Sequence, residues 1–197
     1  MKEDQFWAGD FGTAYTERNQ GADILAARIA MFSRILERAP GVNSVIELGA
    51  NTGINLQAIH LLRPHAKLWG VEVNEAAALQ IPVGRVIIGS ILDYDPVERC
   101  DLAFTRGVLI HVAPDDLPRA YDILYEASGR YIMIAEYFNP TPVMIPYRGH
   151  DDRLWKRDFA GEMLDRFENL HLIDCAFVYR RGEFGQDNVT WFLMEKR

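Results

Sequence analysis

Short apolar runs alternate with amphipathic stretches through the middle of the chain. The apolar runs have the length and composition of buried strands, at residues 42–48, 67–73, 85–89, 101–105 and 130–137. The stretches between them predict helices at 54–62, 75–79 and 115–127. An earlier helix is predicted at 22–39, where apolar residues recur at helical spacing and mark one buried face.

The end of the chain departs from this alternation. A helix is predicted at 158–167, followed by strands at 170–179 and 187–195. The loop between these strands contains Gly182 and Gly185, which favours a hairpin and an antiparallel finish to the sheet. The strands separated by helices predict right-handed crossovers and a parallel sheet. We therefore expect one α/β domain over 1–197, with a Rossmann-like, mostly parallel sheet, a C-terminal antiparallel hairpin and helices on both faces.

One segment fits neither pattern. Residues 139–152 contain three prolines and a glycine, which predict an irregular loop. A long loop in a compact domain is usually functional or disordered. This one is flanked by Tyr137 and carries Tyr147, Arg148 and His150, which favours a substrate loop over a mobile connector.

Composition and charge narrow the classes of function. The 197 residues carry a formal net charge of −7, which is unfavourable for general binding to nucleic acid. No apolar run approaches the roughly 20 residues of a membrane span, and no signal-peptide pattern is found. The 2 cysteines are too few for a disulfide framework and lack metal-ligand spacing. We expect a cytoplasmic protein with a small-molecule substrate and no metal site.

The first candidate site follows the first strand, in the sequence Glu-Leu-Gly-Ala-Asn-Thr-Gly at 47–53. Ligands of open α/β sheets bind at this carboxyl edge of the strands. A dinucleotide-binding turn would need glycine where this chain has Asn51 and Ile54. Glu47 is unsuited to a polyphosphate and suits an amino group or a fixed cation, while Gly49 and Gly53 allow a close approach of the backbone.

Later strand ends supply three more candidate elements. Glu72 ends the second strand, where a carboxylate can bind both hydroxyls of a ribose; the alternative is an acid that faces solvent. After the third strand, a backbone N–H near Ile91, or the side chain of Ser90 or of Asp93, could pair with an adenine edge. Residues 105–111, including Arg106, follow the fourth strand and should lie beneath the same crevice.

Taken together, the motifs ELGANTG, VEVN, GSILD and DLAFTRGVLIH resemble those of class I S-adenosylmethionine-dependent methyltransferases. The resemblance implies S-adenosylmethionine as cofactor. It implies methionine contacts from Glu47, Gly49, Asn51, Gly53 and Arg106, ribose contacts from Glu72 and Val73, and adenine contacts from Ser90 and Ile91.

The resemblance also implies an N-terminal helical cap over the cofactor, at residues 1–40. Trp7, Phe11, Tyr15 and Arg18 match this cap, and Arg18 could pair with the cofactor carboxylate. Ordinary packing of helix against core is the alternative for Trp7 and Phe11. Residues 6–12, 135–142, 147–150, 156–159 and 187–192 more narrowly resemble the pseudaminic acid biosynthesis-associated methylase family, which suggests sugar biosynthesis.

Methyl transfer to a hydroxyl needs a base, and the candidates are His111 and His150. The loop 138–157 supplies the candidate substrate-binding residues Tyr137, Asn139, Tyr147, Arg148 and Arg157. Its basic residues favour an acidic acceptor such as a sugar acid or nucleotide sugar, or else form a solvated face. An NAD-dependent oxidoreductase and a non-catalytic S-adenosylmethionine-binding protein remain alternatives, and the sequence leaves the oligomeric state open.

Overall fold

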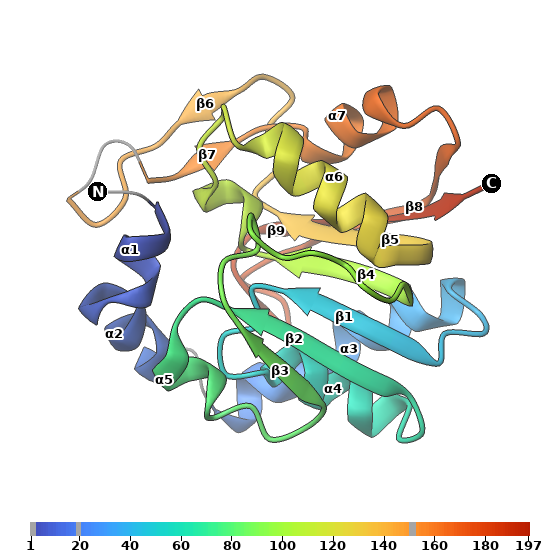
Figure 1. Cartoon of the computed structure of the whole chain (residues 1–197), viewed down its shortest axis with the longest axis horizontal. Coiled ribbons are helices and arrows are strands. Elements are labelled where there is room, and N and C mark those ends of the chain that lie inside the picture. Colours follow the sequence, from blue (N-terminus) through green and yellow to red (C-terminus); the bar gives the residue numbers. More distant parts are fainter. Residues whose placement is uncertain (1–2, 19–20, 150–152) are drawn as a thin grey trace.

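Seven strands form one sheet in the order β3-β2-β1-β4-β5-β9-β8 in the computed structural model, which describes residues 3–18, 21–149 and 153–197 (Figure 1). Five of the strands run parallel to one another: β1 (Ser44–Leu48), β2 (Lys67–Glu72), β3 (Arg85–Ile88), β4 (Cys100–Arg106) and β5 (Ser128–Glu136). Strand β9 (Val189–Lys196) is antiparallel to both β5 and β8 (Leu170–Val178). The predicted α/β sheet with a final antiparallel hairpin is confirmed.

Helices cover both faces of this sheet. Helices α3 (Ala22–Arg38) and α4 (Ile54–Leu62) pack together on one face, and α6 (Leu117–Ala127) and α7 (Phe159–Arg166) cover the other (Figure 1). Helix α5 (Glu75–Ala78) lies beside β2 and β3. The N-terminal helices α1 (Glu3–Ala8) and α2 (Asp10–Arg18) lie near α5, at the end toward which the parallel strands point (Figure 1).

The alternation of side chains along the central strands produces two cores. On β4, Leu102 and Phe104 face α3 and α4, while Ala103 faces α6. The ring of Phe104 lies 5.2 Å from that of Phe32 on α3, centroid to centroid, and neither side chain is exposed. Because both faces are covered, these strands read as continuous apolar runs in the sequence.

The region around the predicted substrate loop holds the main departure from the sequence-based expectation. Strand β6 (Val143–Met144) lies within the segment expected to be irregular and pairs antiparallel with β7 (Trp155–Lys156). The prolines at 140, 142 and 146 flank this short pairing and do not interrupt it, so the pairing keeps its backbone donors. The loop is therefore a small two-stranded flap joined to the edge of the domain.

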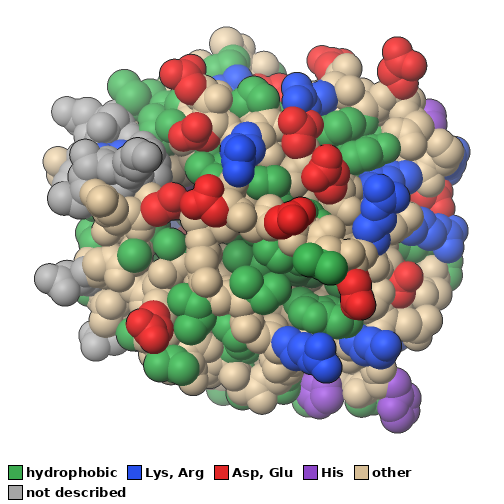
Figure 2. Space-filling view, viewed as in Figure 1, with side chains coloured by type: hydrophobic (Ala, Val, Ile, Leu, Met, Phe, Trp, Pro, Cys, Tyr) green, Lys and Arg blue, Asp and Glu red, His purple; other side chains and the backbone are tan. Residues whose placement is uncertain are grey.

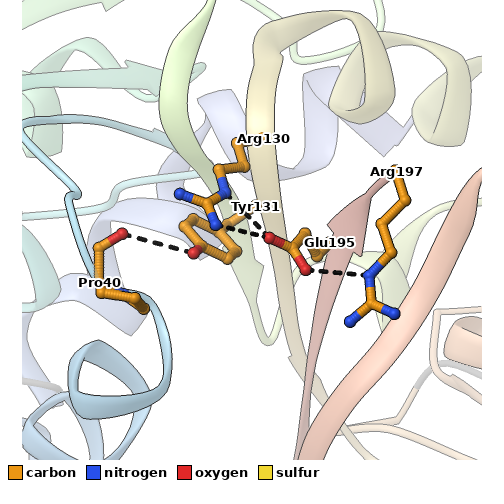
Figure 3. A network of polar contacts seen from close by, with 5 residues as sticks. All are labelled: Pro40, Arg130, Tyr131, Glu195 and Arg197. Carbon is orange, nitrogen blue, oxygen red and sulfur yellow. Dashed lines mark hydrogen bonds and ion pairs between the residues drawn. The ribbon is translucent and has the colours of Figure 1, made fainter.

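A polar network ties the far end of the sheet together, away from the carboxyl ends of the parallel strands (Figure 3). Glu195 on β9 accepts hydrogen bonds from Arg130 Nε at 2.9 Å and from Arg197 Nε at 3.2 Å. Tyr131, the register partner of Glu195, donates to the Pro40 carbonyl at 3.4 Å. Strands β5 and β9 are thereby linked to the segment that follows α3.

Charged side chains of both signs are spread over the face of the molecule shown in Figure 2. No helix within the described ranges is long and apolar enough to cross a membrane. Among the same residues, no group of three or more His, Cys, Asp and Glu is placed to hold a metal ion. Cys100 is buried and Cys175 is exposed, and both are free thiols.

We expect Phe104→Ala to lower the free energy of unfolding by about 3–5 kcal/mol, because it opens a cavity at the centre of the α3-side core. Urea unfolding followed by circular dichroism measures this difference. Leu79→Ala is the control, since the Leu79 side chain is 76% exposed and its removal should change the value by less than about 0.5 kcal/mol. Equal effects of the two variants would contradict this description of the core.

Candidate functional site

A cavity opens at the carboxyl ends of β1, β2 and β4, beneath the N-terminal helices, with about 1170 Å³ of empty space that includes its open mouth. Six segments distant in the sequence form its wall. The lining residues are Asp4, Trp7, Gly12, Tyr15, Thr16, Arg28, Gly49, Ala50, Asn51, Thr52, Ile54, Asn55, Glu72, Val73, Asn74, Ile91, Leu92, Arg106, Gly107, Val108, His111, Val112, Ala113 and Asp116.

The turn after β1 needs glycine at two positions for different reasons. Gly49 has a φ of +83°, and a Cβ there would lie 2.5 Å from Val108 Cγ2. Gly53 has a φ of +74°, and a Cβ there would lie 2.7 Å from Ile81 Cγ2. Gly49 is part of the cavity wall, whereas Gly53 packs against Ile81 and is outside the lining set. The predicted ligand contact of Gly53 stays a prediction, and what the structure shows is that a glycine there allows the turn to pack against Ile81.

Glu72 is held at the end of β2 by the backbone of two neighbouring turns. Its Oε2 accepts a hydrogen bond from Asn51 N at 2.7 Å, and its Oε1 accepts one from Asn74 N at 2.8 Å. Burial raises the pKa of the Glu72 carboxyl, and these backbone donors oppose the rise. Glu72 and Val73 both line the cavity. The two backbone donors fix the Glu72 carboxylate in place, and each of its oxygens can still accept a further hydrogen bond from a ligand in the cavity.

Glu47 is fully buried at the end of β1, and only part of its carboxylate is hydrogen-bonded. Oε1 accepts a hydrogen bond from Asn55 Nδ2 at 2.6 Å, while the buried Oε2 has no hydrogen-bond partner among the described residues. Burial raises the pKa of Glu47 to about 8, and Arg106 and Arg28 act in the opposite direction. Glu47 lies behind the lining residue Asn55, not in the lining set itself.

Two buried guanidinium groups lie in the cavity wall near Glu47. Within the described part of the chain, neither Arg28 Nε nor Arg106 Nε has a hydrogen-bond partner. Burial lowers the pKa of Arg28 to about 9 and also lowers the pKa of Arg106. Arg106 Nη2 donates to Gln186 Oε1 at 2.9 Å, and Gln186 Nε2 donates to the Ala27 carbonyl at 3.0 Å. Gln186, in the loop before β9, therefore contacts Arg106 at the end of β4 and the backbone of α3, the helix that carries Arg28.

Arg28 was absent from the predicted site, although the sequence held a signal for it. It lies four residues after Ile24 and four before Phe32, on the apolar side of α3. A charged residue at that spacing is usually paired or functional when buried. The side chain is 7% exposed, and its guanidinium reaches the cavity.

Hydrogen bonds hold the N-terminal helices over the cavity. Asn74 Nδ2 donates to the Trp7 carbonyl at 3.1 Å and to Thr13 Oγ1 at 3.2 Å. Thr16 Oγ1 donates to Asn51 Oδ1 at 3.1 Å. Asn74 and Thr16 were not predicted, because their partners lie more than thirty residues away in the sequence.

In the loop after β3, Ser90 contacts the N-terminal helix α1, whereas Ile91 lines the cavity. Ser90 Oγ donates to Asp4 Oδ1 at 3.0 Å and so binds α1, and Ser90 is outside the lining set. Ile91 lies in the cavity wall. The predicted adenine contact is therefore placed at the cavity for Ile91, while the Ser90 hydroxyl is engaged by the cap.

Some aromatic residues of the cap line the cavity, and others pack behind them. Trp7 and Tyr15 line the cavity, with ring centroids 5.5 Å apart. Phe11 is outside the lining set and packs against Phe6 at 4.2 Å and Trp7 at 5.5 Å. Phe11 thus follows the packing alternative. The Arg18 side chain and His150 lie outside the residues that the structure describes in full.

His111 ends the short helix η1 (Leu109–His111) after β4 and lines the cavity. Its Nδ1 lies 2.6 Å from the Arg153 carbonyl, which can only accept a hydrogen bond, so Nδ1 carries the proton. The ring centroid lies 4.6 Å from that of Trp7 and 5.1 Å from that of Tyr147. Burial lowers the pKa of His111 to about 4, so the imidazole is neutral at pH 7 with Nε2 as an acceptor.

The five predicted acceptor-binding residues lie outside the lining set of the cavity. Tyr147 contacts the His111 ring, and the exposed Arg148 guanidinium lies 5.6 Å from the Tyr147 ring centroid. Arg157 differs from the prediction, because its Nε donates to Glu162 on α7 at 2.6 Å and the pair is partly buried. Tyr147 therefore lies next to His111, and Arg148 lies next to Tyr147.

Tyr137 and Asn139 follow β5 on the path to β6. The Tyr137 ring lies beneath Lys156 Nζ, 5.4 Å from its centroid. Burial and the nearby Asp187 carboxylate raise the pKa of Tyr137, so its hydroxyl stays protonated. The exposed Asn139 amide donates to the Thr141 carbonyl. These contacts hold the start of the flap and do not place either side chain in the cavity wall.

No family model matches the chain, and no curated protein matches it. Solved structures do match over nearly its whole length. Magnesium protoporphyrin IX methyltransferase from Synechocystis, with bound S-adenosylmethionine, has 11% identity and a TM-score of 0.69, covering 100% of this chain and 98% of that one. A Leishmania major S-adenosylmethionine-dependent methyltransferase has 16% identity and a TM-score of 0.71, covering 99% and 81%.

A plantazolicin methyltransferase, in complex with a pentazolic analogue and S-adenosylhomocysteine, has 14% identity and a TM-score of 0.66, covering 98% of this chain and 95% of that one. These likenesses show that the chain has the Rossmann-like fold of class I S-adenosylmethionine-dependent methyltransferases. The narrower resemblance to the pseudaminic acid biosynthesis-associated methylases is not supported, since no family model matches.

We expect Glu47→Gln to flatten the pH dependence of stability of the ligand-free protein. The folded-state pKa of Glu47, about 8, exceeds its ordinary value of 4.5, so its protonation stabilises the fold fully below about pH 4.5. That stabilisation is lost as the pH rises toward 8. Urea unfolding between pH 5 and 8 should therefore show a steeper fall for the natural protein. Parallel curves for the two proteins would contradict the assignment.

Proposed function

We propose that this protein is a methyltransferase that uses S-adenosylmethionine as methyl donor. The observation that carries the proposal is the pairing of unsatisfied charges beside one turn. Arg28 and Arg106 line the cavity, and their Nε atoms suit a carboxylate. Glu47 lies directly behind the lining residue Asn55, and an ammonium group bound there would lower the pKa of Glu47 and pair with its Oε2. Together they suit an α-amino acid, the chemistry of the methionine part of the donor.

Residues at the ends of β2 and β3 suit the adenosine part of the donor. Strands β1 and β2 are adjacent and parallel, with Leu48 opposite Val71, so Glu72 stands one strand away from Glu47. Its fixed carboxylate suits the two hydroxyls of a ribose, and Ile91 offers an apolar surface for the adenine. Two of the structural neighbours of the same fold were solved with this donor or its demethylated product, which supports the assignment.

An NAD-dependent oxidoreductase fits these residues less well. Asn51 stands where a dinucleotide turn needs its second glycine, and its side chain accepts a hydrogen bond from Thr16 of the cap. Glu47 would place a buried acid near a pyrophosphate. A non-catalytic binding protein would have no use for a neutral imidazole at the cavity, which favours the enzyme.

Glu72, Ile91, Arg28 and Arg106 would hold S-adenosylmethionine in this cavity, where its sulfonium would supply a methyl group for in-line transfer to an acceptor atom, with the thioether as leaving group. His111 receives the proton of a hydroxyl acceptor at Nε2, because Nδ1–H is held by the Arg153 carbonyl. A base at this position contributes roughly 10²–10⁴-fold to the rate. Trp7 and Tyr15 keep water from the reacting atoms by covering the cavity.

The acceptor is a small polar molecule with an acidic group, such as a sugar acid or a nucleotide sugar. The support is Arg148, which is exposed over Tyr147 next to His111, with Lys156 of the flap over Tyr137. Other basic residues of the flap are engaged, as Arg157 is by Glu162. The acceptors named for two neighbours, a magnesium protoporphyrin and a plantazolicin analogue, differ in chemistry, so this proposal rests on the residues of this chain.

We expect Glu72→Ala to weaken binding of S-adenosylmethionine and S-adenosylhomocysteine more than tenfold, because the ribose loses a charged, fixed acceptor. Isothermal titration calorimetry on the full chain measures the dissociation constants. Glu75→Ala, on the exposed first turn of α5, is the matched control and should bind as the natural protein does. Tight binding of NAD without binding of either methyl-donor ligand would overturn the proposed function.

Arg148→Ala should raise the KM for an acidic acceptor by about three- to fivefold with little change in kcat, because an exposed charge contact contributes up to about 1 kcal/mol. The acceptor is first found by screening sugar acids, nucleotide sugars and small carboxylates and detecting the product by mass. Arg63→Ala, exposed at the end of α4, is the control. An unchanged KM in Arg148→Ala would place the acceptor elsewhere.

A further inference from the structure

Glu136 ends β5 with its carboxylate buried beneath the loop that carries His111. Its side chain is 3% exposed. The single oxygen Oε1 accepts hydrogen bonds from Val108 N at 3.0 Å, Leu109 N at 3.1 Å and Thr105 Oγ1 at 3.3 Å. Three donors from the end of β4 and the following turn therefore converge on one atom.

The two backbone donors belong to the turn that places His111. His111 N donates to the Val108 carbonyl at 2.9 Å, and Val108 N donates to Glu136 Oε1. Val108 therefore connects His111 to Glu136. On its outer side, Val108 packs against Gly49, where a Cβ would come within 2.5 Å of it. The turn is thus held by hydrogen bonds to Glu136 on its buried side and by packing against Gly49 on the side that faces the cavity.

An acid at this position costs more to bury than an apolar residue. Burial raises the pKa of Glu136 to about 7, against the effect of its backbone donors. An apolar side chain of similar size would leave the N–H groups of Val108 and Leu109 buried without partners. The hydrogen bonds from Val108 N, Leu109 N and Thr105 Oγ1 offset part of the cost of burying the acid.

We propose that Glu136 is a positioning residue for His111, which it keeps at the cavity by holding the backbone of residues 108 and 109. Glu136 does not itself line the cavity, and it reaches the cavity wall only through the N–H group of Val108. The role of His111 as a proton acceptor rests on the proposed function. Its position can nevertheless be measured without turnover.

The position of His111 can be followed by NMR titration of its ring nitrogens in the full chain, with the signal assigned by its loss in His111→Ala. The groups in contact with the ring are the Arg153 carbonyl, Trp7 and Tyr147, and burial sets the low pKa of about 4. In Glu136→Ala the turn loses its anchor and the ring gains access to water. We expect the pKa of His111 to rise by about 1 or more toward its ordinary range.

Two conservative variants separate positioning from general stability. Glu136→Gln keeps an oxygen acceptor, so the pKa of His111 should stay within about 0.5 of its starting value. Glu136→Asp withdraws the carboxylate by one methylene and should give an intermediate rise. Glu136→Asp also serves if Glu136→Ala does not fold.

Ser128→Ala is the matched control at the opposite end of β5, where the buried Ser128 Oγ donates to the Tyr131 carbonyl at 2.8 Å. It should lower the thermal midpoint and leave His111 unchanged. An unchanged pKa of His111 in folded Glu136→Ala, or in Glu136→Asp where the alanine variant fails, would overturn the inference.

Turnover and donor binding distinguish the two proposals. With an acceptor in hand, Glu136→Ala should lower kcat about tenfold or more, with the donor dissociation constant within about twofold. If the natural protein binds no methyl donor, the proposed function fails while the titration result stands. If the donor binds normally and the titration of His111 is the same in all variants, only the positioning role fails.

Discussion

The need to pair buried charge governs the functional end of this molecule. Glu47, Arg28 and Arg106 are removed from water at the carboxyl ends of the parallel strands, and each keeps an atom without a hydrogen-bond partner among the described residues. Burying a charge without full pairing is costly. A ligand that carries both a carboxylate and an ammonium group would supply these missing partners, which is why the proposed donor suits the site.

The cap over the cavity depends on the same strand ends. Asn74 binds the Trp7 carbonyl and Thr13, while its backbone N–H binds Glu72. One residue thus connects the cap to the carboxylate proposed to hold the ribose.

Buried or partly buried carboxylates at the two ends of the sheet have different kinds of hydrogen-bond partner. At the far end, Arg130 and Arg197 satisfy Glu195, and Tyr131 reaches the Pro40 carbonyl, so β5 and β9 end in a paired network (Figure 3). At the carboxyl end, Glu136 accepts hydrogen bonds from two backbone N–H groups of a turn and from the Thr105 hydroxyl. The same strand is therefore anchored at one end and supports the proposed catalytic turn at the other.

The sequence by itself determined the sheet, because strands buried on both faces appear as apolar runs and helices as 3.6-residue periods. It also indicated Glu72 and His111, which immediately follow or end strands, where position along the chain fixes position in the fold. Only the tertiary structure decided the roles of Arg28, Gln186 and Glu136. The hydrogen-bond partners of Gln186 and Glu136 lie on distant segments, and such bonds leave no periodic pattern in the sequence. The spacing along α3 marked Arg28 as buried, but only the fold places it at the cavity.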